Sequence, residues 1–519
     1  MFRGCFEIFS WRFRLAAFGR EELATLRDVV LDRAELARVL GVEIPTGAKG
    51  VKGVAYDSRR VEPGFAFVAI PGFKRDGVEF VPEALRRGAS LVVAERAVPD
   101  APAAVVPDAR AALAALARAV FGDPSSSMQV YGVTGTNGKT TTVYALYFIL
   151  AGAHGMKRCG LMSTVETISG GERRPAARTT PEAVEVQGTL AGMLERGVRQ
   201  VVMEVSSHGI ELGRVSGTRF EGALFTNLTR DHLDLHGSME AYYETKRELF
   251  RWTEGAKLAN AEDAWGRRLR DEVAGVKTFG GTAAADYRVA RVEATRSETA
   301  FALRYPGGDL RLQTPLLGPY NVLNVAGAAS LALEAGVEGE TVVEAVRGIG
   351  QVPGRFERVA TAGRGGFEVI VDYAHTEVGL EAVLEVARGL VESDGRTVGR
   401  VICVFGAAGE RDGAKRPKMG RVVGRLADLG IVTTDDAYAE DPKEIAREVA
   451  AGADPARTEV LLDRREAIRR ALSTAREGDV VVVAGKGHET VQHLPEGDVP
   501  FHDATVVGEL LEELDRGEG

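Results

Sequence analysis

Short apolar runs alternate along this chain with longer segments in which apolar residues recur at helical spacing. The runs are rich in Val, Ile, Leu and Phe, as buried strands are. They lie at residues 65–70, 91–94, 200–205, 222–228, 368–371, 401–405, 429–433 and 480–484. Because strands that alternate with helices assemble into parallel sheets, the pattern predicts an α/β fold. Residues 284–314 alternate in polarity instead and break at Pro306-Gly-Gly, which predicts a β-ribbon.

Breaks in this pattern predict three domains, as does a length of 519 residues at about 150 residues per domain. Turn-forming residues at 122–127 mark one boundary, and Pro353-Gly354 suits a hinge at the other. The prediction is an extension over 1–22, an α/β domain over 23–126, a central parallel sheet with a phosphate loop over 127–353, and a Rossmann-like domain over 354–519. The last domain has no Gly-x-Gly-x-x-Gly before a helix, so NAD is not expected.

Composition disfavours nucleic-acid-binding, membrane-spanning and disulfide-rich proteins. A hydrophobic content of 45% with 27% charged residues is typical of a globular protein, and the net charge of −9 favours neither nucleic acid nor an anionic membrane as a partner. No apolar run approaches the ~18 residues that a membrane span needs. Arg3, Glu7 and Arg12 interrupt the aromatic first residues, which favours a frayed extension over a signal peptide or a membrane anchor. Three scattered cysteines predict no disulfide framework, which favours a reducing cytoplasm. A monomer is also expected.

Residues 131–142, Tyr-Gly-Val-Thr-Gly-Thr-Asn-Gly-Lys-Thr-Thr-Thr, follow a predicted strand and precede a predicted helix. This context is the one a phosphate loop requires: backbone N–H groups and the helix N-terminus attract phosphate. Lys139 would reach the outer phosphates, and the Thr140 hydroxyl would bind Mg²⁺. In the common phosphate-loop pattern, four residues separate the first Gly from Gly-Lys. In this chain that first position is Val133, and Gly132 lies one residue before it.

The form Thr-Gly-Thr-Asn-Gly-Lys-Thr-Thr resembles the phosphate loop of the Mur ligase family, ATP-dependent enzymes that form peptide bonds in cell-wall synthesis. The resemblance covers essentially the whole chain after about residue 25. It implies that ATP is bound by Gly135, Thr136, Asn137, Gly138, Lys139, Thr140, Thr141, Asn324, Arg355, Asp372 and His375. Asn324 would contact adenine, although a role in starting a helix is an alternative.

The first domain resembles the uridine-nucleotide-binding domain of the tripeptide-synthetase branch of this family, through Asp-Ser-Arg at 57–59, Gly72 and Asp76-Gly77. Asp, Ser and Gly also dominate ordinary turns. Thr-Thr-Pro-Glu at 179–182 is a good helix start, with Thr180 as the expected cap. The resemblance implies that UDP-MurNAc-L-Ala-D-Glu is bound by Ser58, Thr179, Thr180, Ser206 and Arg214.

Acidic and histidine side chains follow two predicted strands of the central domain. Glu204 ends an apolar run, where a buried carboxylate needs a partner such as Mg²⁺. Residues 227–236 match the family's Asn-Leu-Thr-x-Asp-His-Leu-Asp-x-His, which implies that His232 binds a second Mg²⁺ while Asp231, Asp234 and His236 orient it. Lys246 would pass for a surface charge, but the family's matching lysine carries a CO₂-derived carbamate (N6-carboxylysine) that binds the same ion. Lys139, Glu204, His232 and Lys246 are therefore the expected catalytic residues.

Three segments of the last domain resemble family loops. Asp-Tyr-Ala-His-Thr at 372–376 implies ATP contacts, although Glu377 replaces the usual Pro. Gly-Glu-Arg-Asp at 409–412 implies that Arg411 holds the α-carboxylate of an incoming amino acid through two hydrogen bonds. Ala-Gly-Lys-Gly-His-Glu at 484–489 implies that Gly485 and Glu489 face its side-chain amine.

One departure bears on the amino acid. Enzymes of this branch that add meso-diaminopimelate carry Asp-Asn-Pro-Arg, where this chain has Asp435, Asp436, Ala437 and Tyr438. Tyr cannot supply a bidentate cation for a second carboxylate, and Asp436 with Glu489 suits a bare ammonium group. L-lysine or L-ornithine is therefore favoured, with meso-diaminopimelate as the alternative because another Arg could replace the missing one.

The resemblance as a whole implies an ATP-dependent ligase that adds a diamino acid to the D-Glu of UDP-MurNAc-L-Ala-D-Glu through an acyl phosphate, with two Mg²⁺ ions. A sister ligase with a different acceptor is disfavoured by the first domain and by residues 179–182. A nucleotide-binding scaffold without catalysis is the alternative from another class. The presence of Glu204, His232 and Lys246 argues against that alternative.

Overall fold

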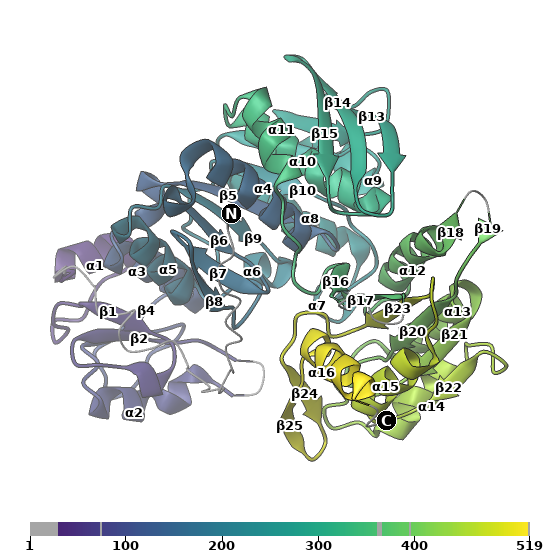
Figure 1. The fold of residues 1–519 in the computed structure, drawn as a ribbon. Helices are drawn as coiled ribbons and strands as arrows, with labels where there is room; N and C mark the ends of the chain where they lie inside the picture. Colours follow the sequence, from purple (N-terminus) through teal and green to yellow (C-terminus); the bar gives the residue numbers. More distant parts are fainter. Residues whose placement is uncertain (1–29, 73–74, 361–365, 394–395, 517–519) are drawn as a thin grey trace. The chain divides into compact units, whose positions relative to one another are not determined.

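The computed structural model describes residues 30–72, 75–360, 366–393 and 396–516. The predicted extension over 1–22, with Cys5, lies outside them. The chain forms two compact units: residues 1–127 with 182–196 and 213–218, and residues 128–181 with 197–212 and 219–519. The ribbon combines helices with sheets whose central strands are parallel, which confirms the predicted α/β class (Figure 1).

The first unit is built on a parallel sheet of four strands in the order β1-β2-β3-β4. The strands are β1 (Gly53–Ala55), β2 (Phe65–Ala69), β3 (Leu91–Ala94) and β4 (Ala103–Val105). The helices are α1 (Arg33–Leu40), α2 (Val81–Arg86), α3 (Ala109–Val120) and α5 (Ala183–Glu195). Helix α5 comes from the following part of the sequence, and its Val184 belongs to the same apolar core as Leu113 and Leu116.

The second unit contains an eleven-stranded sheet in the order β15-β14-β13-β12-β11-β10-β5-β9-β6-β7-β8. Its strands are β5 (Gln129–Thr134), β6 (Cys159–Met162), β7 (Glu166–Ser169), β8 (Glu172–Pro175), β9 (Gln200–Glu204), β10 (Gly222–Phe225), β11 (Ala256–Asn260), β12 (Val276–Gly280), β13 (Tyr287–Ala294), β14 (Thr299–Tyr305) and β15 (Gly308–Thr314). The central strands are parallel, and β13–β15 form the predicted antiparallel ribbon. Parallel strands buried on both faces explain why the sequence shows continuous apolar runs there.

Helices cover this sheet and place the phosphate loop. They are α4 (Lys139–His154), α6 (Ser207–Glu211), α7 (Leu233–His236), α8 (Met239–Trp252), α9 (Ala264–Glu272), α10 (Pro319–Glu334) and α11 (Gly339–Arg347). Helix α4 is buried along most of its length and packs with α10 and α11 in one apolar core. The predicted strand and helix on either side of the loop are confirmed as β5 and α4.

The same unit holds a six-stranded sheet in the order β16-β17-β23-β20-β21-β22, parallel except at β16. Its strands are β16 (Glu357–Val359), β17 (Glu368–Asp372), β20 (Val401–Phe405), β21 (Leu429–Val432), β22 (Thr458–Val460) and β23 (Val480–Ala484). Helices α12 (Glu377–Val391), α13 (Arg416–Leu426) and α14 (Pro442–Ala450) pack on one face, and α15 (Arg464–Thr474) and α16 (Asp503–Asp515) on the other. Two hairpins complete it: β18 (Glu392–Ser393) with β19 (Arg396–Thr397), and β24 (Val491–Leu494) with β25 (Gly497–Pro500).

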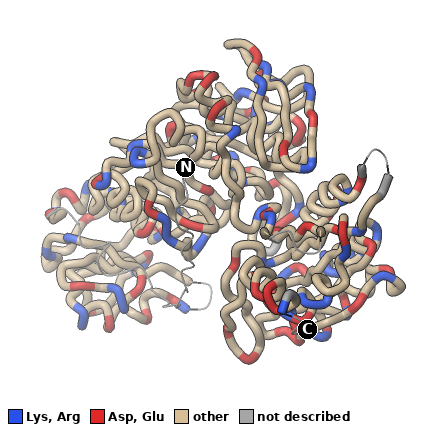
Figure 2. The backbone as a smooth tube through the Cα atoms, viewed as in Figure 1, with Lys and Arg blue, Asp and Glu red and all other residues tan. Residues whose placement is uncertain are grey.

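Charged residues of both signs are intermixed along the backbone of both units (Figure 2). Cys159 and Cys403 are free and buried. Within the described ranges, no helix combines the length and apolar character that crossing a bilayer requires.

Candidate functional site

The turn between β5 and α4 has a shape that only glycine allows at two positions. Gly135 has φ +150°, and a Cβ there would lie 1.9 Å from Thr226 Oγ1. Gly138 has φ +83°, and its Cβ would lie 2.3 Å from Asn324 Oδ1. Lys139 folds back so that its Nζ donates to the carbonyl oxygens of Gly135 and Thr136 at 3.0 and 2.9 Å. The loop is therefore a closed backbone cradle that opens at the N-terminus of α4, a geometry suited to phosphate.

Glu204 and Thr140 supply buried oxygen atoms beside this loop. Glu204 pairs in register with Val133 at the end of β9, and it is 1% exposed. Its carboxylate accepts hydrogen bonds from the Thr164 N–H at 2.8 Å and the Thr164 hydroxyl at 3.1 Å. The Thr140 hydroxyl, also buried, accepts a hydrogen bond from Arg355 Nη2 at 3.3 Å. Carboxylate and hydroxyl oxygens are the donors that Mg²⁺ prefers.

Lys246 is buried although the sequence suggested a surface charge. It lies on α8 and is 1% exposed. Its Nζ donates to the Gly135 carbonyl at 3.0 Å and to Thr134 Oγ1 at 3.4 Å, so its two partners are neutral. Burial, followed by the nearby charge of Lys139, lowers the pKa of Lys246 well below its usual value.

The histidine and aspartate cluster after β10 is described for Asp231, His232 and His236. His232 has φ +51° and lies beside Asp231, with Nε2 3.4 Å from Oδ2. The ring of His236 stacks on Tyr242 at 4.8 Å, and the ring of His208 meets that of His232 edge-on at 4.8 Å. Across the described residues, no three His, Cys, Asp or Glu side chains are grouped so as to hold a metal ion. Asp231 thus contacts His232, and the role of this pair at a second Mg²⁺ ion stays a prediction.

The residues predicted to bind the sugar-peptide substrate already make contacts within their own units. Ser58 is buried and donates to Glu83 Oε2 at 2.7 Å, and Asp57 caps a turn by accepting from the Arg59 N–H. Arg214 Nη2 lies 2.9 Å from Glu182 Oε1 in the first unit. Asp57 therefore has the local role that the turn alternative expected.

The expectation that Thr180 caps the next helix is wrong. Helix α5 begins at Ala183 with Glu182 at its N-cap position. The Thr180 hydroxyl instead donates to the Glu204 carbonyl at 2.9 Å and accepts from the Ser206 N–H at 3.0 Å. Thr179 Oγ1 accepts from Thr164 at 3.1 Å. Thr180 therefore ties residues 179–180 to the end of β9, close to Glu204.

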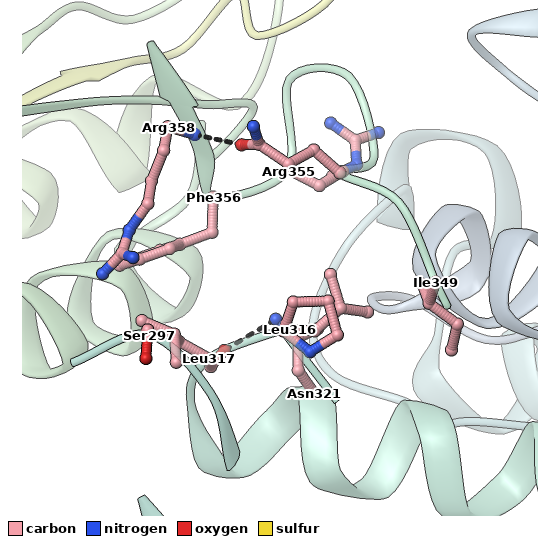
Figure 3. Close-up of a pocket in the computed structure, with 10 residues that line it drawn as sticks. Ser297, Leu316, Leu317, Asn321, Ile349, Arg355, Phe356 and Arg358 are labelled. Atoms are coloured by element: carbon pink, nitrogen blue, oxygen red, sulfur yellow. Dashed lines mark hydrogen bonds between the residues drawn. The ribbon is translucent and has the colours of Figure 1, made fainter. Parts of the chain in front are cut away.

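A cavity of about 320 Å³ lies near the first turn of α10 (Figure 3). Its lining combines apolar side chains with amide and guanidinium groups: Ser297, Pro315, Leu316, Leu317, Asn321, Ile349, Gln351, Arg355, Phe356 and Arg358. Asn321 accepts a hydrogen bond from Asn324 Nδ2 at 3.1 Å, and Asn324 Oδ1 accepts from the Thr142 hydroxyl at 3.3 Å. A chain of hydrogen bonds thus connects this cavity to α4.

Asp372 is the last residue of β17, one residue beyond the predicted end of this strand, and His375 follows it. The Asp372 carboxylate accepts from the N–H groups of Phe356 at 2.6 Å and Ala374 at 2.7 Å. Burial raises its pKa, with the Arg355 charge acting in the opposite direction. The His375 ring bonds through Nδ1 to the Tyr373 carbonyl at 2.8 Å. Asp372 therefore fixes the backbone around Arg355.

The residues predicted to bind an amino acid gather at the ends of β21 and β23. A Cβ at Gly485, where φ is +116°, would lie 2.5 Å from Asp435 Oδ2. Asp436 Oδ1 lies 2.7 Å from Lys486 Nζ, and Glu489 Oε2 lies 3.0 Å from the same nitrogen. Asp436 therefore already has a cationic partner inside the protein.

Arg411 and Tyr438 also come together in this region. The Arg411 guanidinium lies 5.8 Å from the centre of the Tyr438 ring, which stacks on His493 at 5.2 Å. Tyr438 has φ +51°, and its N–H donates to the His493 carbonyl at 3.1 Å. The hairpin β24–β25 therefore supports the segment that departs from the family pattern.

Sequence reasoning missed several side chains of this region. In the sequence, Lys486 is one residue of a glycine-rich loop and has no evident function. Its position three residues before Glu489 is the one sign that the two could form an ion pair. Lys415 is half-buried; burial lowers its pKa, while the charges of Asp231 and Asp435 oppose that shift. Tyr373 donates to Glu489 Oε1 at 3.1 Å. A lysine or tyrosine near a strand end has no distinctive pattern, so only the fold identifies these residues.

Three family models match the chain: Mur ligase family, catalytic domain, at residues 50–121; Mur ligase middle domain at 133–332; and Mur ligase, glutamate ligase domain, at 354–487. The UDP-N-acetylmuramoyl-L-alanyl-D-glutamate–2,6-diaminopimelate ligase of Solibacter usitatus is 40% identical over 494 residues, covering 93% of this chain and 97% of that protein. The protein of the same name from Syntrophomonas wolfei is 39% identical over 490 residues, covering 92% and 98%. A solved structure of a ligase with this name shares 30% identity and a TM-score of 0.65, covering 94% of this chain and 100% of that one.

Proposed function

Because this chain belongs to the Mur ligase family, we propose that it joins a diamino acid to the D-Glu γ-carboxylate of UDP-MurNAc-L-Ala-D-Glu at the expense of ATP. The family consists of ATP-dependent amino-acid ligases of peptidoglycan synthesis. The observation that carries the proposal is the 40% identity to a ligase of this specificity over 93% of the chain. The buried arrangement around the phosphate loop is consistent with it.

The chemistry proposed has two steps. A D-Glu carboxylate oxygen takes the γ-phosphoryl group of ATP, and ADP leaves. The amine of the diamino acid then attacks the acyl carbon and loses a proton, and phosphate leaves as the amide forms. Phosphoryl transfer depends on positioning and charge neutralisation rather than on covalent help from the protein. Lys139, the N–H groups of residues 135–141 and Arg355 would provide these for the phosphates.

The oxygen atoms beside the phosphate loop could bind one Mg²⁺ ion without any modification of the protein. Thr140 and Glu204 are buried oxygen donors next to the phosphate cradle, and substrate phosphates and water would complete the six ligands. An ion held there would offset the negative charge that develops on the transferred phosphoryl group. Lys139 and Thr164 would keep Glu204 and the phosphates in place.

A second ion fits only if Lys246 is modified, because an amine is a poor ligand for Mg²⁺. The lowered pKa of Lys246 favours the neutral amine, which is the form that reacts with CO₂. The nitrogen lone pair would add to the carbon of CO₂ and one proton would be released, giving N6-carboxylysine. The new carboxylate, with His232 supported by Asp231, would then provide the donors that the cluster lacks.

We further infer that the cavity beside α10 accepts the base of ATP. Its apolar walls suit a planar heterocycle, and Asn321 and Gln351 offer amide groups for hydrogen bonding. Its connection through Asn324 to Thr142 would place the base within reach of the phosphate loop.

For the amino acid, meso-diaminopimelate is better supported than L-lysine or L-ornithine. The relatives at 39–40% identity are named for 2,6-diaminopimelate. A preference for lysine requires Asp436 to add a free negative charge, whereas that carboxylate lies 2.7 Å from the buried ammonium of Lys486. Arg411, beside Tyr438, and Lys415 are cations of that region that could bind carboxylates.

Release of phosphate from ATP by the purified protein tests the proposal. We expect release only when UDP-MurNAc-L-Ala-D-Glu and meso-diaminopimelate are both present, with little turnover when L-lysine or L-ornithine replaces the latter. Turnover with lysine but not with diaminopimelate would reverse the assignment of the amino acid. Binding of ATP without turnover in any combination would favour a non-catalytic scaffold.

A further inference from the structure

Two carboxylates in the C-terminal sheet region share one buried ammonium group. The Lys486 side chain is 0% exposed, and its Nζ lies 2.7 Å from Asp436 Oδ1 and 3.0 Å from Glu489 Oε2. The Asp436 side chain is 9% exposed, whereas that of Glu489 is 33% exposed. The carboxylate of Asp436 is thus buried, whereas that of Glu489 is partly exposed to solvent.

Asp436 is held in its inward position by several bonds. The Oδ1 atom that meets Lys486 also accepts from the His493 N–H at 3.0 Å, and the Asp436 N–H donates to Asp435 Oδ1 at 2.8 Å. Gln492 Nε2 donates to the carbonyl oxygens of Thr434 and Asp435 at 3.1 and 3.2 Å, which ties the segment to β24. Turning the carboxylate outward would leave Lys486 and the His493 N–H without this partner, at a high cost for buried groups.

We propose that Asp436 is a positioning residue that serves as the counter-ion of Lys486, so that the charge of Glu489 remains available for the ammonium group of the incoming diamino acid. The role of Glu489 in this statement rests on the proposed function. With a neutral residue at 436, Glu489 would become the counter-ion of Lys486 and its attraction for a substrate ammonium would fall.

The other charged groups nearby fit this assignment. Arg464 is fully buried and makes two hydrogen bonds to Asp503, at 2.8 and 2.7 Å, so its charge is already balanced. Asp435 is 5% exposed and adds a further negative charge next to Gly485. Lys486 alone therefore does not balance Asp435, Asp436 and Glu489, and Arg411 and Lys415 supply the other positive charges of this region.

A double-mutant cycle distinguishes this role from direct contact between Asp436 and the substrate. Asp436→Asn is expected to raise KM for the diamino acid about tenfold, the effect of weakening one charge-assisted interaction, with kcat and KM for ATP little changed. In Asp436→Asn with Lys486→Met, Glu489 is free again, so KM should return to near the wild-type value. A double variant with KM as high as Asp436→Asn alone would overturn the proposal. Lys443→Met, at an exposed lysine of α14, is the matched control and should leave KM unchanged.

Unfolding in urea provides a readout that does not depend on turnover. Lys486→Met should destabilise the protein because it leaves Asp436 buried without a cation, and adding Asp436→Asn should recover part of that loss. Strictly additive effects would show that the two residues are not coupled and would overturn the proposal, whatever substrate the protein uses. The two substitutions could be coupled in stability in a protein that turns over no diamino acid. That result would establish the ion pair but overturn the proposed function and the role of Glu489.

Discussion

Two buried lysines of this chain have opposite surroundings. Lys246, beside the phosphate loop, donates to a carbonyl and a hydroxyl oxygen, whereas Lys486, in the C-terminal sheet region, lies between two carboxylates. The pKa of Lys246 is lowered well below its usual value by burial, while the pKa of Lys486 is raised because nearby carboxylates outweigh the effect of burial. The surroundings thus favour the neutral form of the lysine in one place and the charged form in the other.

On the proposed function, the difference follows from what each site would hold. The charges at the phosphate loop would come from the phosphates, a metal ion and Lys139, so the partners of Lys246 can be neutral. A site for an amino acid must present fixed charges before the substrate arrives, and buried carboxylates then require an internal cation.

Replacing Lys246 should have the largest effect on activity. Lys246→Arg keeps a cation but cannot form a carbamate, and Lys246→Ala removes the group, so both should lower kcat by about a thousandfold, as the loss of a key electrostatic group does. Phosphate release with saturating substrates measures this. Lys257→Arg, on β11, is the control and should stay close to wild type. Near-normal activity of Lys246→Arg would contradict the proposed carbamate.

Breaking the Arg464–Asp503 pair should have the largest effect on stability. Both side chains are 0% exposed, so Arg464→Met should lower the free energy of unfolding by about 3 kcal/mol by leaving Asp503 unpaired. Adding Asp503→Leu should recover much of that loss. Urea denaturation measures both variants, and an equal loss in the single and double variants would show that the pair is not the cause.

The two lysines should contribute to the pH dependence of stability with opposite signs. Between the lowered folded-state pKa of Lys246 and its usual value of 10.5, the lysine is protonated in the unfolded chain but not in the folded one. Its contribution to stability therefore increases as pH rises through that interval. The raised pKa of Lys486 gives a contribution that is complete below its usual value of 10.5 and is lost as pH rises through the folded-state pKa. Denaturation of Lys246→Met and Lys486→Met in CO₂-free buffer from about pH 7 to 11 measures both. If the free energy of unfolding depended on pH in the same way in both variants, the proposed difference between the two lysines would be contradicted.

An exposed ion pair should contribute least. Arg447 and Glu444 on α14 lie 2.7 Å apart with side chains 68% and 60% exposed. Water screens such a pair, so Arg447→Ala should change the free energy of unfolding by less than about 0.5 kcal/mol. If Arg447→Ala lowered the free energy of unfolding as much as Arg464→Met, burial would not explain the difference between exposed and buried ion pairs.

Residue patterns predicted most of the framework. The apolar runs correctly predicted strands such as β2, β20 and β23, and the glycine-rich turn predicted the junction of β5 with α4. The cap at Thr180 was predicted wrongly because hydroxyls that can cap a helix can also bind a neighbouring strand end, as Thr180 does at Glu204. The roles given to individual site residues stay predictions until they are tested by mutation.

The sequence by itself determined the α/β class, the phosphate loop and the family, because these depend on local spacing of apolar, glycine and motif residues. Only the tertiary structure decided the direction in which the pKa of each of the two lysines is shifted. Residues distant in sequence, such as Asp436 and Lys486, become partners only when the sheet that contains β21 and β23 brings the segments after these strands together. Burial and the sign of the nearest charge are properties of the folded chain, and they decide whether a lysine is a neutral amine or a counter-ion.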